Sequence, residues 1–150
     1  AALRRSADDI TSLIAEGAPV RLCKGAYREP IAVAFPTKAE VDRSYLELLT
    51  RLLREGTSPA LATHDPRMIR AATELVEREG IDRERFEFQM LYGVRRDLQA
   101  QLVEAGYRVR IYVPYGREWY PYFMRRLAER PANVMFILRS VAHEERRRSG

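Results

Sequence analysis

Two adjacent arginines, Arg125 and Arg126, precede Glu129 by four and three positions in the stretch YPYFMRRLAER. Arginine pairs with carboxylates through planar, charge-assisted hydrogen bonds, and a glutamate at i+3 or i+4 on a helix can hold such a side chain in place. Aromatic residues precede the pair, namely Tyr112, Tyr115, Trp119, Tyr120 and Tyr122. This combination predicts a pocket for a small carboxylate, with a solvated Arg/Glu helix face as the alternative.

A further arginine lies inside an apolar run, VRLCKGAY at 20–27. Side chains alternate along a strand, so Arg21, Cys23 and Tyr27 would share one face. An arginine in a parallel strand is costly unless an anion or a hydrogen-bond acceptor pairs with it. A structural pair with a neighbouring strand and a charge directed at a ligand both remain open. Gly25 would allow a close approach to the backbone.

Polar residues also follow two later apolar runs, PALATHD at 59–65 and FEFQMLYG at 86–93. Thr63 and His64 could hydrogen-bond a bound cofactor, while Asp65 would cap the helix that follows. Phe86 and Phe88 are expected in the core. Gln89 shares the other face with Glu87 and Leu91, and a buried amide there needs partners. With His143 as the only other histidine, no metal site built on several histidines is expected.

The elements that must position these residues repeat along the chain. Short apolar runs and helical patterns alternate, at 20–27, 41–56, 59–65, 66–80, 86–93, 95–106, 109–116 and 119–130. Strands that alternate with helices of this length predict an α/β fold with a parallel sheet. A small doubly wound sheet and half of an eight-stranded βα barrel both fit, and both place function at the carboxyl ends of the strands. No GxGxxG motif supports a dinucleotide-binding unit.

Composition narrows the class of protein. The 150 residues are 46% hydrophobic and 31% charged, which is enough for one folded domain. The net charge of +5 is spread over faces that also carry acids, so no nucleic-acid partner is expected. Only 143–150 forms a basic tail, which we expect to be disordered. The single cysteine excludes an internal disulfide and favours a reducing, cytoplasmic compartment.

The start of the sequence has no initiator methionine and reads as the body and end of a helix. We therefore expect a fragment or a processed form with further sequence upstream. No apolar run approaches the roughly 18 residues that a membrane span needs. The sequence also has no signal-peptide pattern.

Taken in order, VRLCKGAY, ATHD, FEFQMLYG, RIYVPYG and YPYFMRRLAER resemble the C-terminal half of proline dehydrogenase. The small monofunctional bacterial enzymes are the most similar, and the same domain occurs in bifunctional proline-utilisation proteins. The resemblance extends over residues 10–139. It implies a distorted (βα)8 TIM barrel that binds FAD. Residues 1–150 would then be a single partial domain, the last four βα units of the barrel.

The resemblance also implies an activity: FAD-dependent oxidation of L-proline to Δ1-pyrroline-5-carboxylate, with hydride passing from C5 to flavin N5. Electrons would continue to a membrane quinone, which implies peripheral contact with the inner face of the bacterial membrane. A flavin barrel that oxidises hydroxyproline is one alternative. Another is an inactive half-barrel that self-associates or binds a partner. In the family, a catalytic aspartate and a lysine lie on the first half of the barrel, which this sequence does not match. A half-barrel would also expose two sheet edges, and such open edges favour homo-oligomers.

Matched motif by motif, the resemblance assigns roles to individual residues. Arg21, beside the flavin, and Tyr112 are the catalytic candidates. The substrate-binding residues would be Arg125 and Arg126 on the carboxylate, Glu129 holding them, and Tyr27 and Tyr112 against the ring. The residues at the cofactor would be Arg21, Lys24, Gly25, Ala26, Thr63, His64, Gln89 and Leu91. No metal is implied.

Overall fold

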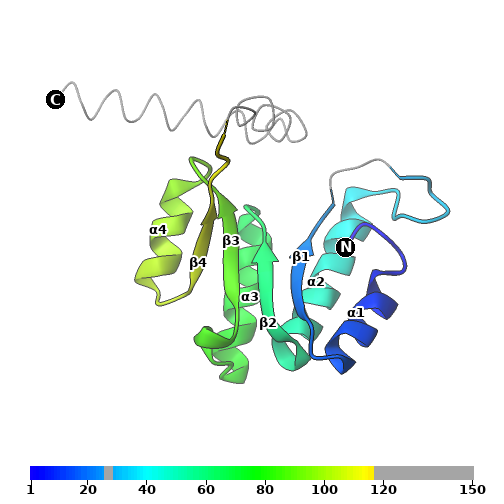
Figure 1. Cartoon of the computed structure of the whole chain (residues 1–150), viewed down its shortest axis with the longest axis horizontal. Coiled ribbons are helices and arrows are strands. Elements are labelled where there is room, and N and C mark those ends of the chain that lie inside the picture. The colour runs from blue at the N-terminus through cyan, green and yellow to red at the C-terminus, as the bar shows by residue number, and fades with distance from the viewer. Residues whose placement is uncertain (26–28, 117–150) are drawn as a thin grey trace.

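The computed structural model describes residues 1–25 and 29–116. Strands and helices alternate through this part of the chain (Figure 1). They are α1 (Ser6–Ala15), β1 (Pro19–Cys23), α2 (Lys38–Glu55), β2 (Thr57–Ala62), α3 (Pro66–Glu79), a 3₁₀ turn (Arg83–Arg85), β3 (Glu87–Leu91), α4 (Arg96–Glu104) and β4 (Val109–Tyr112). The predicted α/β class is confirmed. The helix predicted at 119–130 and the tail at 143–150 lie outside the described residues.

The four strands form one parallel sheet in the order β1-β2-β3-β4. A doubly wound sheet reverses its strand order at a switch point, whereas a βα barrel adds its strands in chain order. The observed order is therefore that of a barrel segment. The register aligns Leu22, Leu61, Phe88 and Val109 in one row across the sheet.

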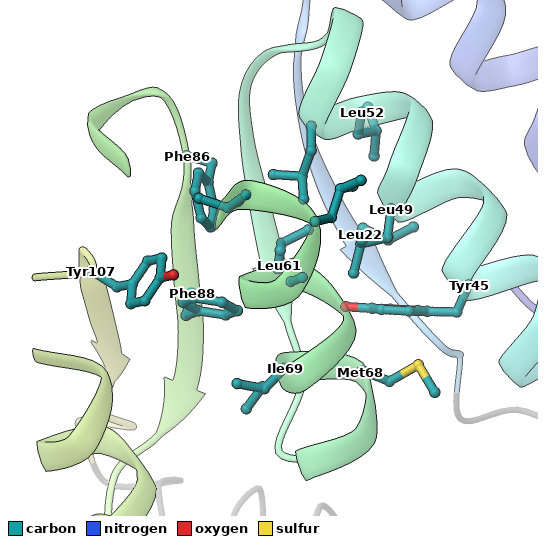
Figure 2. Packing of buried hydrophobic residues seen from close by; sticks show 14 of the residues in the cluster. Leu22, Tyr45, Leu49, Leu52, Leu61, Met68, Ile69, Phe86, Phe88 and Tyr107 are labelled. Atoms are coloured by element: carbon teal, nitrogen blue, oxygen red, sulfur yellow. The ribbon is translucent and has the colours of Figure 1, made fainter. Parts of the chain in front are cut away.

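This row belongs to the face that packs against the helices, here called the covered face. Figure 1 shows α2 and α3 behind the strands, with α1 beside β1 and α4 beside β4. Leu61 and Phe88 are fully buried there. The close view in Figure 2 shows Leu49 of α2 beside Leu22, and Leu52 of the same helix belongs to the same core cluster. Burial of such side chains contributes roughly 1.5–3 kcal/mol each, so this face is the main source of stability.

The opposite side of the sheet, here called the open face, carries a row of small and polar residues instead of large apolar ones. Cys23, Ala62, Gln89 and Arg110 align across it. Arg110 is exposed, while Cys23 and Gln89 are half-buried. Parallel sheets with both faces covered are apolar on both sides. The alternation seen here therefore means that the described residues cover only one face.

The helix ends follow local rules. Thr37 forms a reciprocal capping box with Glu40, so α2 begins three residues before the predicted start at 41. Asp65 caps α3, as predicted, and Gly80 ends it with a left-handed φ of 64°. One expectation is corrected: α1 begins at Ser6 after five preceding residues, so the chain does not open inside a helix. Among the described residues, no helix has the length and apolarity to cross a bilayer.

Candidate functional site

The predicted site residues gather at the carboxyl ends of neighbouring strands. β1 ends at Cys23, β2 at Ala62, β3 at Leu91 and β4 at Tyr112. Lys24 and Gly25 follow the first strand, and Thr63 and His64 follow the second. Parallel strands place these ends at one edge of the sheet. The predicted residues outside the described part of the chain are Ala26, Tyr27, Arg125, Arg126 and Glu129, so their roles stay predictions.

Arg21 lies on the open face and has an uncharged partner. Its Nε donates to Oε1 of Gln89 at 2.6 Å, and Nη1 lies 3.0 Å from Sγ of Cys23. Gln89 belongs to β3, so the contact passes over β2. It can do so because the β2 residues opposite Arg21 and Cys23 are the small Ala60 and Ala62. Arg21 therefore has a structural partner, an amide of a non-adjacent strand, and its role toward a ligand stays a prediction.

The amide of Gln89 is held on its other side by Glu87. Gln89 Nε2 donates to Oε1 of Glu87 at 2.6 Å. The same carboxylate accepts two hydrogen bonds from Arg110, at 2.7 Å from Nε and 2.8 Å from Nη2. The bond from Arg110 lowers the pKa of Glu87, burial opposes this, and the bond from Gln89 adds to the lowering. Glu87 is therefore a well-held anion.

Glu87 and Arg110 were not predicted as site residues. The signal was present in the alternation, because Glu87 precedes Gln89 by two positions and Arg110 precedes Tyr112 by two. Together with Arg21 and Gln89, both residues line an open depression of about 380 Å³ on this face. Arg85 and Arg108 also line it, so cationic groups outnumber the single carboxylate.

Lys24 points into the helix layer, away from the open face. Its Nζ contacts Oδ1 of Asp42 in α2 and lies 2.7 Å from Oδ2 of Asp65 at the start of α3. The lysine side chain is only 8% exposed. Arg67 and Lys38 complete the cluster by contacting Asp42 at 2.7 and 2.8 Å. The cluster joins the end of β1 to two helices. The side chain of Lys24 is thus engaged within this cluster, and the predicted place of Lys24 at the cofactor stays a prediction.

Both aspartates of this cluster are held ionised. Burial would raise the pKa of Asp42, but hydrogen bonds from Lys24, Lys38 and Arg67 outweigh it and bring the pKa to about 2. Burial likewise opposes ionisation of Asp65. Hydrogen bonds from Arg67 and Lys24 lower its pKa well below the usual range. The cluster is thus a set of compensated charges at neutral pH.

Thr63 and His64 organise the loop after β2. Thr63 is buried, and its Oγ1 accepts from the backbone N–H of Asp65 at 3.1 Å. His64 Nε2 accepts from the backbone N–H of Leu91 at 2.8 Å. A neutral His64 must then carry its proton on Nδ1. This bond ties the end of β2 to the end of β3, so these residues shape the edge where a ligand would sit.

Two further predicted residues lie at the same edge. Gly25 has a φ of 96°, a conformation that suits glycine, directly after Lys24. Tyr112 pairs in register with Leu91 and is 49% exposed. It shares the open face with Arg110, two positions earlier. Its ring is accessible to a molecule bound over the strand ends.

Fold and site together define a segment of a βα barrel, with polar residues on the open face and at the carboxyl ends of its strands. The family model described as proline dehydrogenase matches residues 15–139, and the chain belongs to this family. Curated relatives are proline dehydrogenase from Deinococcus radiodurans, 50% identical, and proline dehydrogenase 2 from Bacillus subtilis, 47% identical, each over 93% of this chain.

A solved structure is also similar. It is proline utilization A (PutA) from Bdellovibrio bacteriovorus inactivated by N-propargylglycine, with a TM-score of 0.74 and 36% identity. The match covers 83% of this chain and 15% of that chain. The chain spans 45% and 46% of the length of the two curated relatives. The chain therefore corresponds to part of each of these longer proteins.

Proposed function

We propose that this chain is the C-terminal half of the barrel in an enzyme that oxidises L-proline to Δ1-pyrroline-5-carboxylate, with FAD as the cofactor. Family membership supports the reaction class. The observation that carries the proposal is the placement of Arg21, a guanidinium held on the open face by Gln89. Such a fixed cation on the open face of the sheet is suited to an electron-rich ring system.

The donor set on the open face fits FAD. Arginine has five N–H donors, and the bonds to Gln89 and Cys23 use two of them, so Arg21 retains donors for ring acceptors. Gly25, Ala26 and the backbone of Lys24 would line the cofactor, with Thr63, His64, Gln89 and Leu91 around it. When bound, FAD supplies the hydride acceptor, its N5 atom, for the hydrogen at C5 of proline.

The remaining roles concern the substrate. Arg125 and Arg126 bind the carboxylate, and Glu129 holds both arginines in place. Tyr27 and Tyr112 pack against the pyrrolidine ring and exclude water from it. This arrangement fixes the direction in which C5 points, which is the main requirement for hydride transfer. Only Tyr112 among these residues lies in the described part of the chain.

The location and partners follow from the same proposal. A membrane quinone would accept the electrons, so the protein would work in the cytoplasm, in peripheral contact with the inner face of the membrane. Homo-oligomer formation is proposed for the 150-residue chain by itself, because β1 and β4 are the open edges of the described sheet.

The test uses a composite enzyme in which this chain replaces the matched segment of the D. radiodurans relative. The purified composite enzyme should carry a bound flavin with visible absorbance, and anaerobic L-proline should bleach it. Initial rates on L-proline and trans-4-hydroxy-L-proline then decide between the two substrates. A colourless composite enzyme would refute the cofactor assignment. A colourless, discrete homodimer of the 150-residue chain would favour the binding-module alternative.

The carboxylate role of Arg126 gives a second expectation. Arg126→Met in the composite enzyme should raise KM for proline at least about 10-fold, because a charge-assisted contact is lost. The FAD content should stay close to that of the parent, since the role is confined to the substrate. Arg130→Met, four positions later on the same predicted helix, is the control. Equal KM values for the two variants would exclude the carboxylate role.

A further inference from the structure

We propose that Glu87 and Arg110 are positioning residues, which set the direction of Arg21 through the amide of Gln89. The inference rests on the proposed function, because it concerns the guanidinium placed at the cofactor. Its basis is a continuous hydrogen-bond chain across the open face, Arg110–Glu87–Gln89–Arg21. The sequence resemblance assigns a role to Gln89 and Arg21 and none to the other two residues.

The first step is the orientation of the amide. A glutamine side chain can present either its oxygen or its nitrogen to a given neighbour. The ionised carboxylate of Glu87 only accepts hydrogen bonds, so it selects the Nε2 side of Gln89, at 2.6 Å. The Oε1 side then faces the opposite way, where Nε of Arg21 donates to it at 2.6 Å. Glu87 thereby decides which group meets Arg21.

The second step is the state of Glu87. Two parallel hydrogen bonds from Arg110 hold both carboxylate oxygens in one plane. The glutamate side chain is 14% exposed, and Arg110 is the group that pairs with its charge. Loss of Arg110 would leave a largely buried carboxylate free to rotate or to take up a proton. Either change removes the preference for one orientation of Gln89.

The third step is the path over β2. Arg21 and Gln89 come from strands on either side of β2, and Ala60 and Ala62 are the β2 residues between them in the register. Their methyl groups leave room for the Arg21 side chain to lie across the strand. The sheet is therefore built so that an acceptor on β3 can hold a cation from β1.

A purely structural role makes a different prediction. Arg110 is 64% exposed, and exposed ion pairs add little to stability, typically below about 1 kcal/mol. Arg54 and Glu79 form a matched pair between α2 and α3, also with two hydrogen bonds, at 2.9 and 2.7 Å. If ion pairs in this protein act only on stability, removing either arginine should have the same consequences.

The test compares Arg110→Met and Glu87→Gln with the control Arg54→Met in the composite enzyme. A glutamine at position 87 both donates and accepts, so it no longer selects one orientation of Gln89. The two open-face variants should weaken FAD binding by roughly 10-fold, as expected for coupled contacts, and should shift the visible flavin band. Arg110→Lys, which keeps the charge but cannot form the paired hydrogen bonds, should recover only part of the loss. Arg54→Met should bind FAD like the parent.

A double substitution tests whether Arg110 affects FAD binding by way of Arg21. Arg21→Met/Arg110→Met should bind FAD no more weakly than Arg21→Met alone, because the proposed effect of Arg110 passes through Gln89 to Arg21. A further loss in the double variant would mean that the effect reaches FAD through Gln89 itself, and the proposed path would be wrong. If Arg21→Met weakens FAD binding while Arg110→Met and Glu87→Gln do not, the positioning role is wrong and the proposed function stands. If the parent composite enzyme binds no FAD, the proposed function is wrong, and the FAD measurement does not bear on Glu87 and Arg110.

A measurement on the 150-residue chain tests the positioning role even where the composite enzyme binds no FAD. Exchange of the Arg21 Nε–H proton with solvent can be followed by arginine-selective NMR. The bond to Gln89 should slow this exchange in the parent chain and in Arg54→Met, and Glu87→Gln should accelerate it severalfold. Unchanged exchange in Glu87→Gln would overturn the inference without reference to any cofactor.

Discussion

Replacing Lys24 with methionine is expected to lower the free energy of unfolding by about 3 kcal/mol, because it removes the buried cation that two largely buried carboxylates share and leaves them only exposed cationic partners. Lys24 contacts both Asp42 and Asp65 from a side chain that is 8% exposed. Methionine has a similar length, so the loss reflects charge more than volume. Urea denaturation of the 150-residue chain, followed by circular dichroism, measures the change.

Lys38→Met is the matched control, because Lys38 contacts the same Asp42 at 2.8 Å from a side chain that is 74% exposed. An exposed partner contributes little, so the control should change stability by less than about 1 kcal/mol. Equal losses in the two variants would mean that the burial of Lys24 has no energetic consequence.

The same cluster predicts acid sensitivity. The pKa of Asp42 is lower in the folded chain than its ordinary value of 3.8, at about 2, and that of Asp65 is also lowered. A carboxylate with a lowered folded-state pKa stabilises the fold above its ordinary pKa, and this contribution is lost as the pH falls. Stability should therefore decline between about pH 5 and pH 2. The decline should be smaller in Lys24→Met, and an identical pH profile would contradict this account.

Replacing Phe88 with alanine is expected to lower the free energy of unfolding by roughly 3–5 kcal/mol. The ring is fully buried in β3 and packs edge-on against Phe86 and Tyr107, with centroid distances of 5.5 and 5.6 Å. Removing it leaves a cavity between the sheet and the segment leading into β4. The midpoint of urea denaturation reports the loss.

Tyr92→Ala is the control for this substitution. Tyr92 is an aromatic residue just after the same strand, but it is 61% exposed. Removing an exposed ring should change stability by less than about 0.5 kcal/mol. Hydrogen exchange gives a second readout: amide protons of β4 should exchange faster in Phe88→Ala and not in Tyr92→Ala. Similar denaturation midpoints for the two variants would show that the core is not centred on Phe88.

Much of the architecture was predictable because it follows from short-range patterns. Apolar runs and helical spacing identified four strands and three of the helices, and the predicted helix at 66–80 agrees with α3 to within one residue. Asp65 and Gly80 mark its ends through capping rules that depend only on neighbouring residues. The start of α2 was missed because its signal is the capping box at Thr37, which lies before the apolar pattern.

The sequence by itself determined the α/β class, the alternation that puts Arg21 and Cys23 on one face, and the family motifs. Only the tertiary structure decided the partners. Arg21 meets Gln89 at a separation of 68 residues, across the alanines of β2. Lys24 turns to Asp42 and Asp65 in the helix layer. Such contacts depend on strand register and on the size of the intervening side chains, and neither quantity is encoded in a local pattern of residues.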